Sequence, residues 1–330
     1  MTVVRKIWLT GFGMLLVLAG VMGLALLMGS ADKGIAPFFR ALLNLGEADP
    51  LLHTIIWEIR FPRVMVAALV GATLSLGGLV FQALLRNPLA EPYILGISGG
   101  SAIGAIIGIL LGLARFPGVS LLAFLGGMGT LFLVLFIATG KTLLKKEALL
   151  LSGVMVNAFC SAVIMFLISL TQDARIHNIM FWLMGDLSSV GKSEALLIAA
   201  MVGPCFIVIF WLSNTMNLML MGKEMAHSMG VNVRLVTVLL LVITSLMVSA
   251  TVSHCGLVAF VGLVIPHMFR LLIGADHRVL APACLFGGAG YLVLCDLLAR
   301  TLPRHGEMPA GVITAMVGAP VFIILLKRTG

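Results

Sequence analysis

The chain has 330 residues, of which 61% are apolar and only 10% are charged, whereas ordinary soluble domains are roughly 25% charged. This composition excludes a soluble globular protein and indicates an integral membrane protein, with room for about ten helices of roughly 20 apolar residues each. The net charge of +8 comes from basic residues spread singly between apolar runs, which argues against a nucleic-acid surface.

Apolar runs predict an all-α polytopic membrane protein with about ten transmembrane helices in one domain, residues 1–330. The runs cover residues 7–28, 64–85, 93–113, 118–140, 148–170, 194–213, 235–253, 255–273, 279–297 and 308–326. The first run is longer than the core of a secretory signal, about 7 to 15 residues, and is therefore interpreted as a span. The eighth is interrupted by Pro266, His267 and Arg270, and the third carries a glycine every four residues, which predicts close helix packing.

An even number of spans places both chain termini on the same side of the membrane. With the termini in the cytoplasm, the inner connections carry the whole net positive charge and the outer connections are balanced. Because Lys and Arg near span ends favour the cytoplasmic side, we expect both termini to be cytoplasmic.

Ionisable residues are nearly absent from the predicted spans. Asp296 and Glu194 lie at predicted ends, and His267 lies in the interrupted eighth run. Proton-coupled carriers usually place carboxylates inside the membrane, so the sequence disfavours a secondary carrier. It contains no metalloprotease motif and no nucleophile elbow, which disfavours a membrane enzyme.

The sequence predicts neither a metal site nor a nucleotide site. The five cysteines are odd in number and show no Cys-x-x-Cys spacing, so we expect packing roles for them. The nearest match to a phosphate loop, GDLSSVGKS from Gly185 to Ser193, has five residues between its glycines instead of the required four. Any ATP that drives this protein must therefore be hydrolysed by a partner.

A polar connection between the sixth and seventh spans, about residues 214–234, falls on the predicted cytoplasmic side. Within it, Met225, Ala226 and Met229 recur at helical spacing before Gly230, which predicts a short amphipathic helix. Flexible methionines suit insertion into a groove of another protein. We interpret the segment as a docking helix, and a solvated linker is the alternative.

Six motifs, in this order along the chain, resemble one known family. They are RFPR (Arg60 to Arg63), RNPLAEPYILG (Arg86 to Gly96), WLMGDLSS (Trp182 to Ser189), GKEMAHSMGV (Gly222 to Val231), CGLVAFVGLVIPHMFRLLIGADHR (Cys255 to Arg278) and EMPAGVITAMVGAPVFIILL (Glu307 to Leu326). The chain is similar along nearly its whole length to the permease subunits of bacterial ATP-binding-cassette importers for iron chelates, haem and cobalamin.

The resemblance implies a homodimeric permease in the bacterial cytoplasmic (inner) membrane, with the substrate path along the dimer axis. Two cytoplasmic ATPase subunits would bind below, and a substrate-binding protein would dock above. The chain itself would hold no cofactor, since ATP and Mg would bind to the ATPase. The expected substrate is a ferric siderophore, with cobalamin and haem as close alternatives, moved by alternating access.

The resemblance also assigns roles to particular residues. It implies that Asn87 and Leu89 form part of a cytoplasmic gate. It implies that Arg60, Arg63 and Arg300 pair with glutamates of the binding protein, because a guanidinium fork suits a carboxylate; ordinary interfacial anchoring is the alternative. The residues expected to couple to the ATPase are Gly222, Glu224, Met225, Ala226, Met229 and Gly230.

Overall fold

The computed structural model describes residues 2–28, 50–138, 146–171, 173–188, 190–303 and 306–329, and these residues form helices and connections without a strand. The cytoplasmic lysines expected at 141 and 145 lie outside the described residues. The elements in chain order are α1 (Val3–Leu27), α3 (Pro50–Thr54), η1 (Ile55–Arg60), α4 (Phe61–Leu85), η2 (Pro92–Leu95), α5 (Ile97–Leu110), η3 (Arg115–Val119), α6 (Ser120–Ala138), α7 (Lys146–Ser169), α8 (Asp173–Met184), α9 (Lys192–Trp211), α10 (Ser213–Leu220), α11 (Lys223–Ser228), α12 (Val233–Cys255), α13 (Val261–Ile273), α14 (His277–Thr301) and α15 (Ala310–Thr329).

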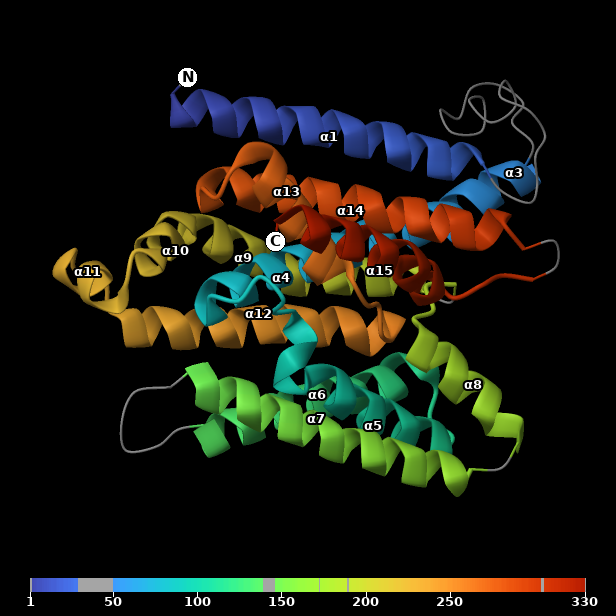
Figure 1. The fold of residues 1–330 in the computed structure, drawn as a ribbon. Coiled ribbons are helices and arrows are strands. Elements are labelled where there is room, and N and C mark those ends of the chain that lie inside the picture. The colour runs from blue at the N-terminus through green and yellow to red at the C-terminus, as the bar shows by residue number, and fades with distance from the viewer. Residues whose placement is uncertain are drawn as a thin grey trace.

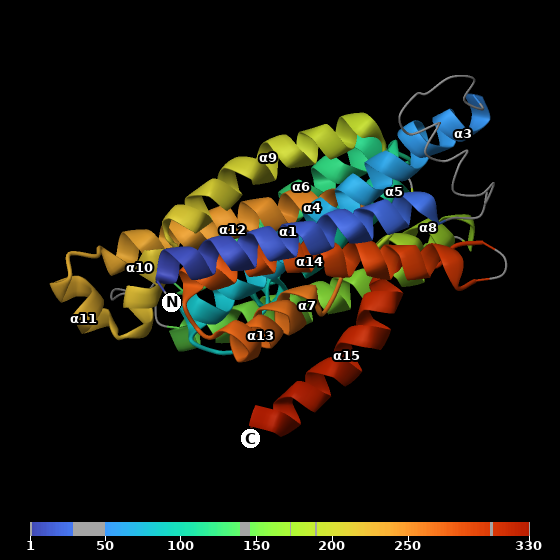
Figure 2. The same cartoon turned by 90° about the horizontal axis from the view of Figure 1, so that it is seen from above.

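The predicted spans each correspond to one helix, which confirms the expected all-α polytopic fold. Among the residues that the structure describes, seven helical stretches are long and apolar enough to cross a membrane, and the shorter apolar helices are α5, α13 and α15. The start of α1 and the pair α10 and α11 lie toward the same end of the bundle (Figures 1 and 2). Helix α8 was not predicted, because its 12 residues are too few to cross a membrane.

Helix α4 is the centre of the bundle, and most of its side chains are buried on all sides. It packs against α14, α13, α12 and α9. An ideal Cβ at Gly78 would lie 1.8 Å from the carbonyl oxygen of Gly262 on α13, so only glycine allows this approach. Between α5 and α6, a Cβ at Gly104 would lie 2.1 Å from the carbonyl of Leu122, which confirms the close packing predicted for the glycine-spaced run.

The short helices α5 and α13 both follow segments that return into the bundle. An ideal Cβ at Gly77 on α4 would lie 3.0 Å from Pro92, so the chain after α4 has turned back by about 12 Å along that helix. The Tyr93 hydroxyl donates to the carbonyl of Val258 at 3.0 Å and accepts from its N–H at 3.1 Å. The Tyr93 side chain therefore satisfies both backbone groups of Val258 inside the protein, as non-helical backbone at membrane depth requires.

The eighth span differs from its expected form. Helix α13 runs without a break through Pro266 and His267, and the interruption lies earlier, after Gly256 (φ 74°) and at Phe260 (φ 69°). Pro266, His267 and Arg270, which interrupt the apolar run in the sequence, thus lie within the helix. Both residues with positive φ lie in the returning segment, which explains why the helix starts at Val261 and is short.

Candidate functional site

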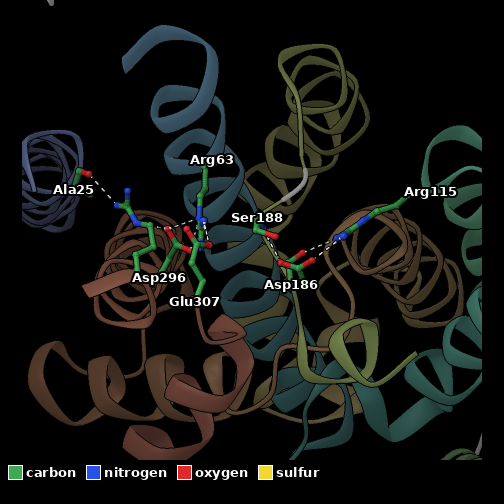
Figure 3. Close-up of polar contacts among 8 residues, drawn as sticks. Ala25, Arg63, Arg115, Asp186, Ser188, Asp296 and Glu307 are labelled. Atoms are coloured by element: carbon green, nitrogen blue, oxygen red, sulfur yellow. Dashed lines mark hydrogen bonds and ion pairs between the residues drawn. The ribbon is translucent and has the colours of Figure 1, made fainter. Parts of the chain in front are cut away.

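A buried ion pair joins α4 to α14 at the end of the bundle that faces outward in the predicted topology (Figure 3). Arg63 donates from Nε to both carboxylate oxygens of Asp296, at 2.9 and 3.2 Å. The Asp296 side chain is 1% exposed, and Arg300 Nε lies 3.3 Å from it, one helical turn further along α14. A carboxylate this deeply buried is tolerated only when it is paired.

A second carboxylate reaches the same arginine from the connection between α14 and α15. Arg63 Nη1 donates to Glu307 Oε2 at 2.6 Å, and the Glu307 side chain is 47% exposed while that of Arg63 is 7% exposed. Arg63 and Arg300 share the single buried Asp296, so Glu307 supplies the remaining negative charge. The Arg63–Glu307 ion pair therefore connects the buried group of Arg63, Asp296 and Arg300 to the protein surface.

Two of the three predicted docking arginines hold the C-terminal end of α1. Arg60 Nη1 donates to the carbonyls of Leu26 at 2.8 Å and Leu27 at 3.2 Å, and Arg300 Nη2 donates to the carbonyl of Ala25 at 2.9 Å. The last carbonyls of a helix lack partners within it and carry partial negative charge, so cations stabilise that end. The structure thus brings Arg60, Arg63 and Arg300 together but buries them among groups of their own chain. Docking to glutamates of another protein stays a prediction.

A further ion pair that the sequence did not reveal joins η3 to the connection between α8 and α9. Arg115 donates from Nη1 to Asp186 Oδ2 at 2.7 Å and from Nη2 to the Asp186 carbonyl at 2.9 Å, and the N–H of Ser188 donates to Asp186 Oδ1 at 2.8 Å. Burial alone would raise the pKa of the Asp186 carboxyl, but the hydrogen bonds from Arg115 and Ser188 outweigh it and lower that pKa. Asp186 stands inside WLMGDLSS, whereas no motif marked Arg115.

Beside this ion pair lies a polar cavity of about 630 Å³. Its polar lining residues are Arg115, Asp186, Ser188, Arg175, His177 and Asn178, and apolar side chains such as Leu113 and Phe181 complete the lining. The end of α8 packs directly against the backbone at Gly256, because a Cβ at Gly256 would lie 2.0 Å from the carbonyl oxygen of Trp182. Only glycine allows this contact. The cavity can receive a molecule rich in oxygen atoms at the outer end of the bundle.

The two predicted gate residues form one tight turn after α4. The N–H of Leu89 donates to Asn87 Oδ1 at 2.9 Å, and the N–H of Ala90 donates to the Asn87 carbonyl at 3.1 Å. Leu89 is 45% exposed, whereas Ala90 has no exposed surface. The turn therefore stands where the chain passes from the surface into the bundle, and its gating role stays a prediction.

The predicted coupling segment contains two short helices, α10 and α11, separated by Gly222 (φ 131°) and followed by Gly230 (φ 83°). Met225 and Met229 are 49% and 57% exposed, as expected for docking residues, but Ala226 has no exposed surface. The expectation that Ala226 presses into a partner's groove needs correction, because its side chain packs inside its own chain. Glu224 lies on the exposed side of α11.

A side-chain link that the sequence analysis missed fastens α10 to the start of α14. Asn217 Nδ2 donates to Asp276 Oδ1 at 2.7 Å, and Asn217 Oδ1 accepts from the N–H of His277 at 2.9 Å. Hydrogen bonds from Arg278 in the first place, and from Asn217, lower the pKa of Asp276 to about 2. These hydrogen bonds join α10 to the start of α14, the helix that carries Asp296 toward its other end.

Comparison with known proteins places this geometry in a family. The model of the FecCD transport family matches residues 15–328. The chain is 38% identical to the vitamin B12 import system permease protein BtuC of Salmonella arizonae, covering 98% of this chain and 94% of that protein. It is 37% identical to the hemin transport system permease protein HmuU of Yersinia pestis, covering 96% and 95%. A solved inward-facing transporter of the metal-chelate ABC type superposes with a TM-score of 0.87 at 30% identity, covering 96% of this chain and 98% of that one.

Proposed function

Since the chain belongs to the FecCD transport family, and is a multi-pass permease subunit of an ABC importer of the inner membrane, we propose that its substrate is a ferric siderophore. The observation that supports this choice is the outer cavity of about 630 Å³ with Arg115 and Arg175 at its edge. Cationic side chains suit an oxygen-rich, anionic chelate. Cobalamin and haem are the alternatives, because relatives are named for vitamin B12 and hemin.

Permeases of this family work with separate ATPase subunits, and two such subunits are proposed to drive this chain. The exposed Met225 and Met229 support the α10–α11 region as the site that meets the ATPase. A second copy of the chain is proposed to complete the substrate path. The exposed apolar side chains of α7 and α15, among them Phe159, Phe166 and Met316, support a surface covered by a second copy or by lipid.

A binding protein is proposed to dock on the outer end through Arg60, Arg63 and Arg300. Arg63 already pairs with the partly exposed Glu307, and a guanidinium fork of this kind would equally suit a carboxylate of a docking surface. Because Glu307 is half exposed, it is the carboxylate that a docking glutamate would displace from Arg63.

Reconstitution tests this proposal in two stages. The permease in proteoliposomes should take up substrate only with the cognate ATPase and ATP inside and the loaded binding protein outside. Uptake by the permease alone, driven by a proton gradient, would identify a secondary carrier and overturn the proposal. The chelate retained by the purified binding protein then decides between siderophore, cobalamin and haem, since only a retained ferric siderophore agrees with the proposed substrate.

A further inference from the structure

A second cavity, of about 450 Å³, lies at the end of the bundle that carries α10 and α11. The last turn of α4 and the first turns of α7 and α12 form its walls, and Leu84, Leu149 and Leu241 line its interior. These three side chains are 7%, 3% and 0% exposed. The lining residues on α12 run from Asn232 to Leu241, a length of about 13 Å along that helix.

Basic side chains surround the opening of this cavity. Arg86, Lys146 and Arg234 line it, and Glu224 is the one acidic residue among its described lining residues. Arg86 is exposed and donates from Nη2 to the carbonyl of Met219, which leaves most of its five donors for another acceptor. Arg234 is exposed and makes no hydrogen bond or ion pair to the residues that the structure describes.

The backbone of Arg86 gives independent support for a role of its side chain. It has φ 49° and ψ 41°, in the left-handed region, and ends α4 there. A residue with a Cβ is sterically disfavoured in this conformation, whereas glycine adopts it without strain and is common just after a helix. An arginine at this position therefore indicates a requirement for its guanidinium.

We propose that this cavity binds one anionic phospholipid of the cytoplasmic leaflet, with its phosphate between Arg86 and Arg234 and an acyl chain along α12. The inference rests on the proposed orientation, in which α10 and α11 are cytoplasmic, and not on the transported substrate. Basic pockets between membrane helices on the cytoplasmic side suit anionic headgroups. The exposed Leu235, Val238 and Leu239 beside Arg234 continue the apolar surface toward the bilayer.

The charge pattern alone would also suit an acidic surface of the ATPase, but the apolar interior favours lipid. Its walls are turns of three spanning helices, and a protein partner would have to insert apolar side chains between them. Glu224 and His227 of α11 border the same cavity, so a bound lipid would contact the coupling segment. Anionic lipid is therefore expected to influence how α11 meets the ATPase.

Lipid retention by the purified full-length permease tests the site. The protein is exchanged into mixed micelles containing phosphatidylglycerol or phosphatidylcholine, with glycerol 1-phosphate as a headgroup without chains, and retained lipid is counted by native mass spectrometry. The wild type should retain one phosphatidylglycerol in preference to phosphatidylcholine, and glycerol 1-phosphate should not compete. The double variant Arg86→Gln/Arg234→Gln should weaken retention by about 25-fold, roughly fivefold for each charge.

Two further variants serve as controls for the lipid-retention experiment. Lys192→Gln removes an exposed positive charge at the opposite end, outside both cavities, and should leave retention unchanged. Thr237→Phe fills the cavity beside α12, keeps both arginines and should also abolish retention. Equal retention of the two lipids, or wild-type retention by both cavity variants, overturns the proposal. If the double variant keeps its lipid but loses the ATPase, the cavity is a protein-docking site and the proposal is wrong.

Discussion

Arg63 and Glu307 form an ion pair of 2.6 Å in which the arginine is buried and the glutamate is half exposed. The arginine is held on its other side by Asp296, which is fully enclosed. The glutamate stands in a connection between two helices, so it can leave the pair without any movement of α4 or α14. Arg63 therefore has one buried partner, Asp296, and one partly exposed partner, Glu307, that another carboxylate can replace.

Glu307→Gln should increase the affinity of the permease for its binding protein by roughly fivefold, because Arg63 is then available to a docking carboxylate. Binding of the loaded binding protein to the permease in nanodiscs measures this. Glu58→Gln is the matched control, since Glu58 and Lys192 form an ion pair with both side chains exposed. If Glu307→Gln leaves the affinity unchanged or lowers it, Glu307 does not compete for Arg63.

Asp296→Asn should destabilise the permease by about 3 to 5 kcal/mol, because removal of one partner leaves Arg63 and Arg300 buried without compensation. Thermal unfolding of the purified protein measures the loss. The control Glu307→Gln removes a half-exposed charge from the same arginine and should shift unfolding far less. Similar shifts for both variants would mean that burial does not decide the strength of these pairs.

Gly78→Ala should prevent correct packing of α4 on α13, because the new Cβ would lie 1.8 Å from the Gly262 carbonyl, which is backbone and cannot rotate away. We expect little monodisperse protein by size-exclusion chromatography after expression. Gly203→Ala on α9, where a Cβ meets nothing within 4 Å, should be neutral or slightly stabilising. Normal yield of Gly78→Ala would contradict the tight crossing.

Acid should weaken the link between α10 and α14 only at low pH. The folded-state pKa of Asp276 is about 2, below the value of about 3.9 in an unfolded chain. Its contribution to stability is therefore complete above about pH 4 and is lost as pH falls through about 2. Unfolding of Asp276→Asn should depend less on pH between 5 and 2.5 than that of the wild type, and an equal dependence would contradict this assignment.

The number and order of the spans were predictable because each apolar run is a local property of the chain. The ends of α5 and α13 were not, because both depend on segments that return into the bundle and meet through Tyr93 and Val258. Hydropathy records how apolar a segment is but not how deep it lies. The partly polar α8 was missed because its 12 residues are too few to stand out as a membrane span.

The candidate site was predictable where a motif marked it and not where distant residues meet. Arg60, Arg63 and Arg300 were found by resemblance, but their carbonyl partners at the end of α1 lie far away in the sequence. Arg115 pairs with Asp186 across 71 positions, and neither spacing nor composition reveals such a pair. Burial of Ala226 also depends on the tertiary position of α11.

Docking of the coupling segment is best tested at the methionines and not at Ala226. The double variant Met225→Asp/Met229→Asp places two charges at exposed positions, one in α11 and one directly after it. The permease should therefore keep its stability. Each charge would be buried without a partner in an apolar groove, a penalty of a few kcal/mol. The variant should therefore lose the ATPase in a pull-down and lose uptake in the same membranes.

Ala226→Arg should act differently, because Ala226 has no exposed surface and the larger side chain must displace its own chain. Its thermal unfolding should shift to lower temperature even without the ATPase, whereas that of the methionine variant should not. Leu302→Asp, at a 60% exposed position after α14 and outside the coupling segment, controls for added charge and should keep the ATPase. If the methionine variant retains both ATPase binding and uptake, this segment is a solvated linker and the coupling must lie elsewhere on the cytoplasmic end.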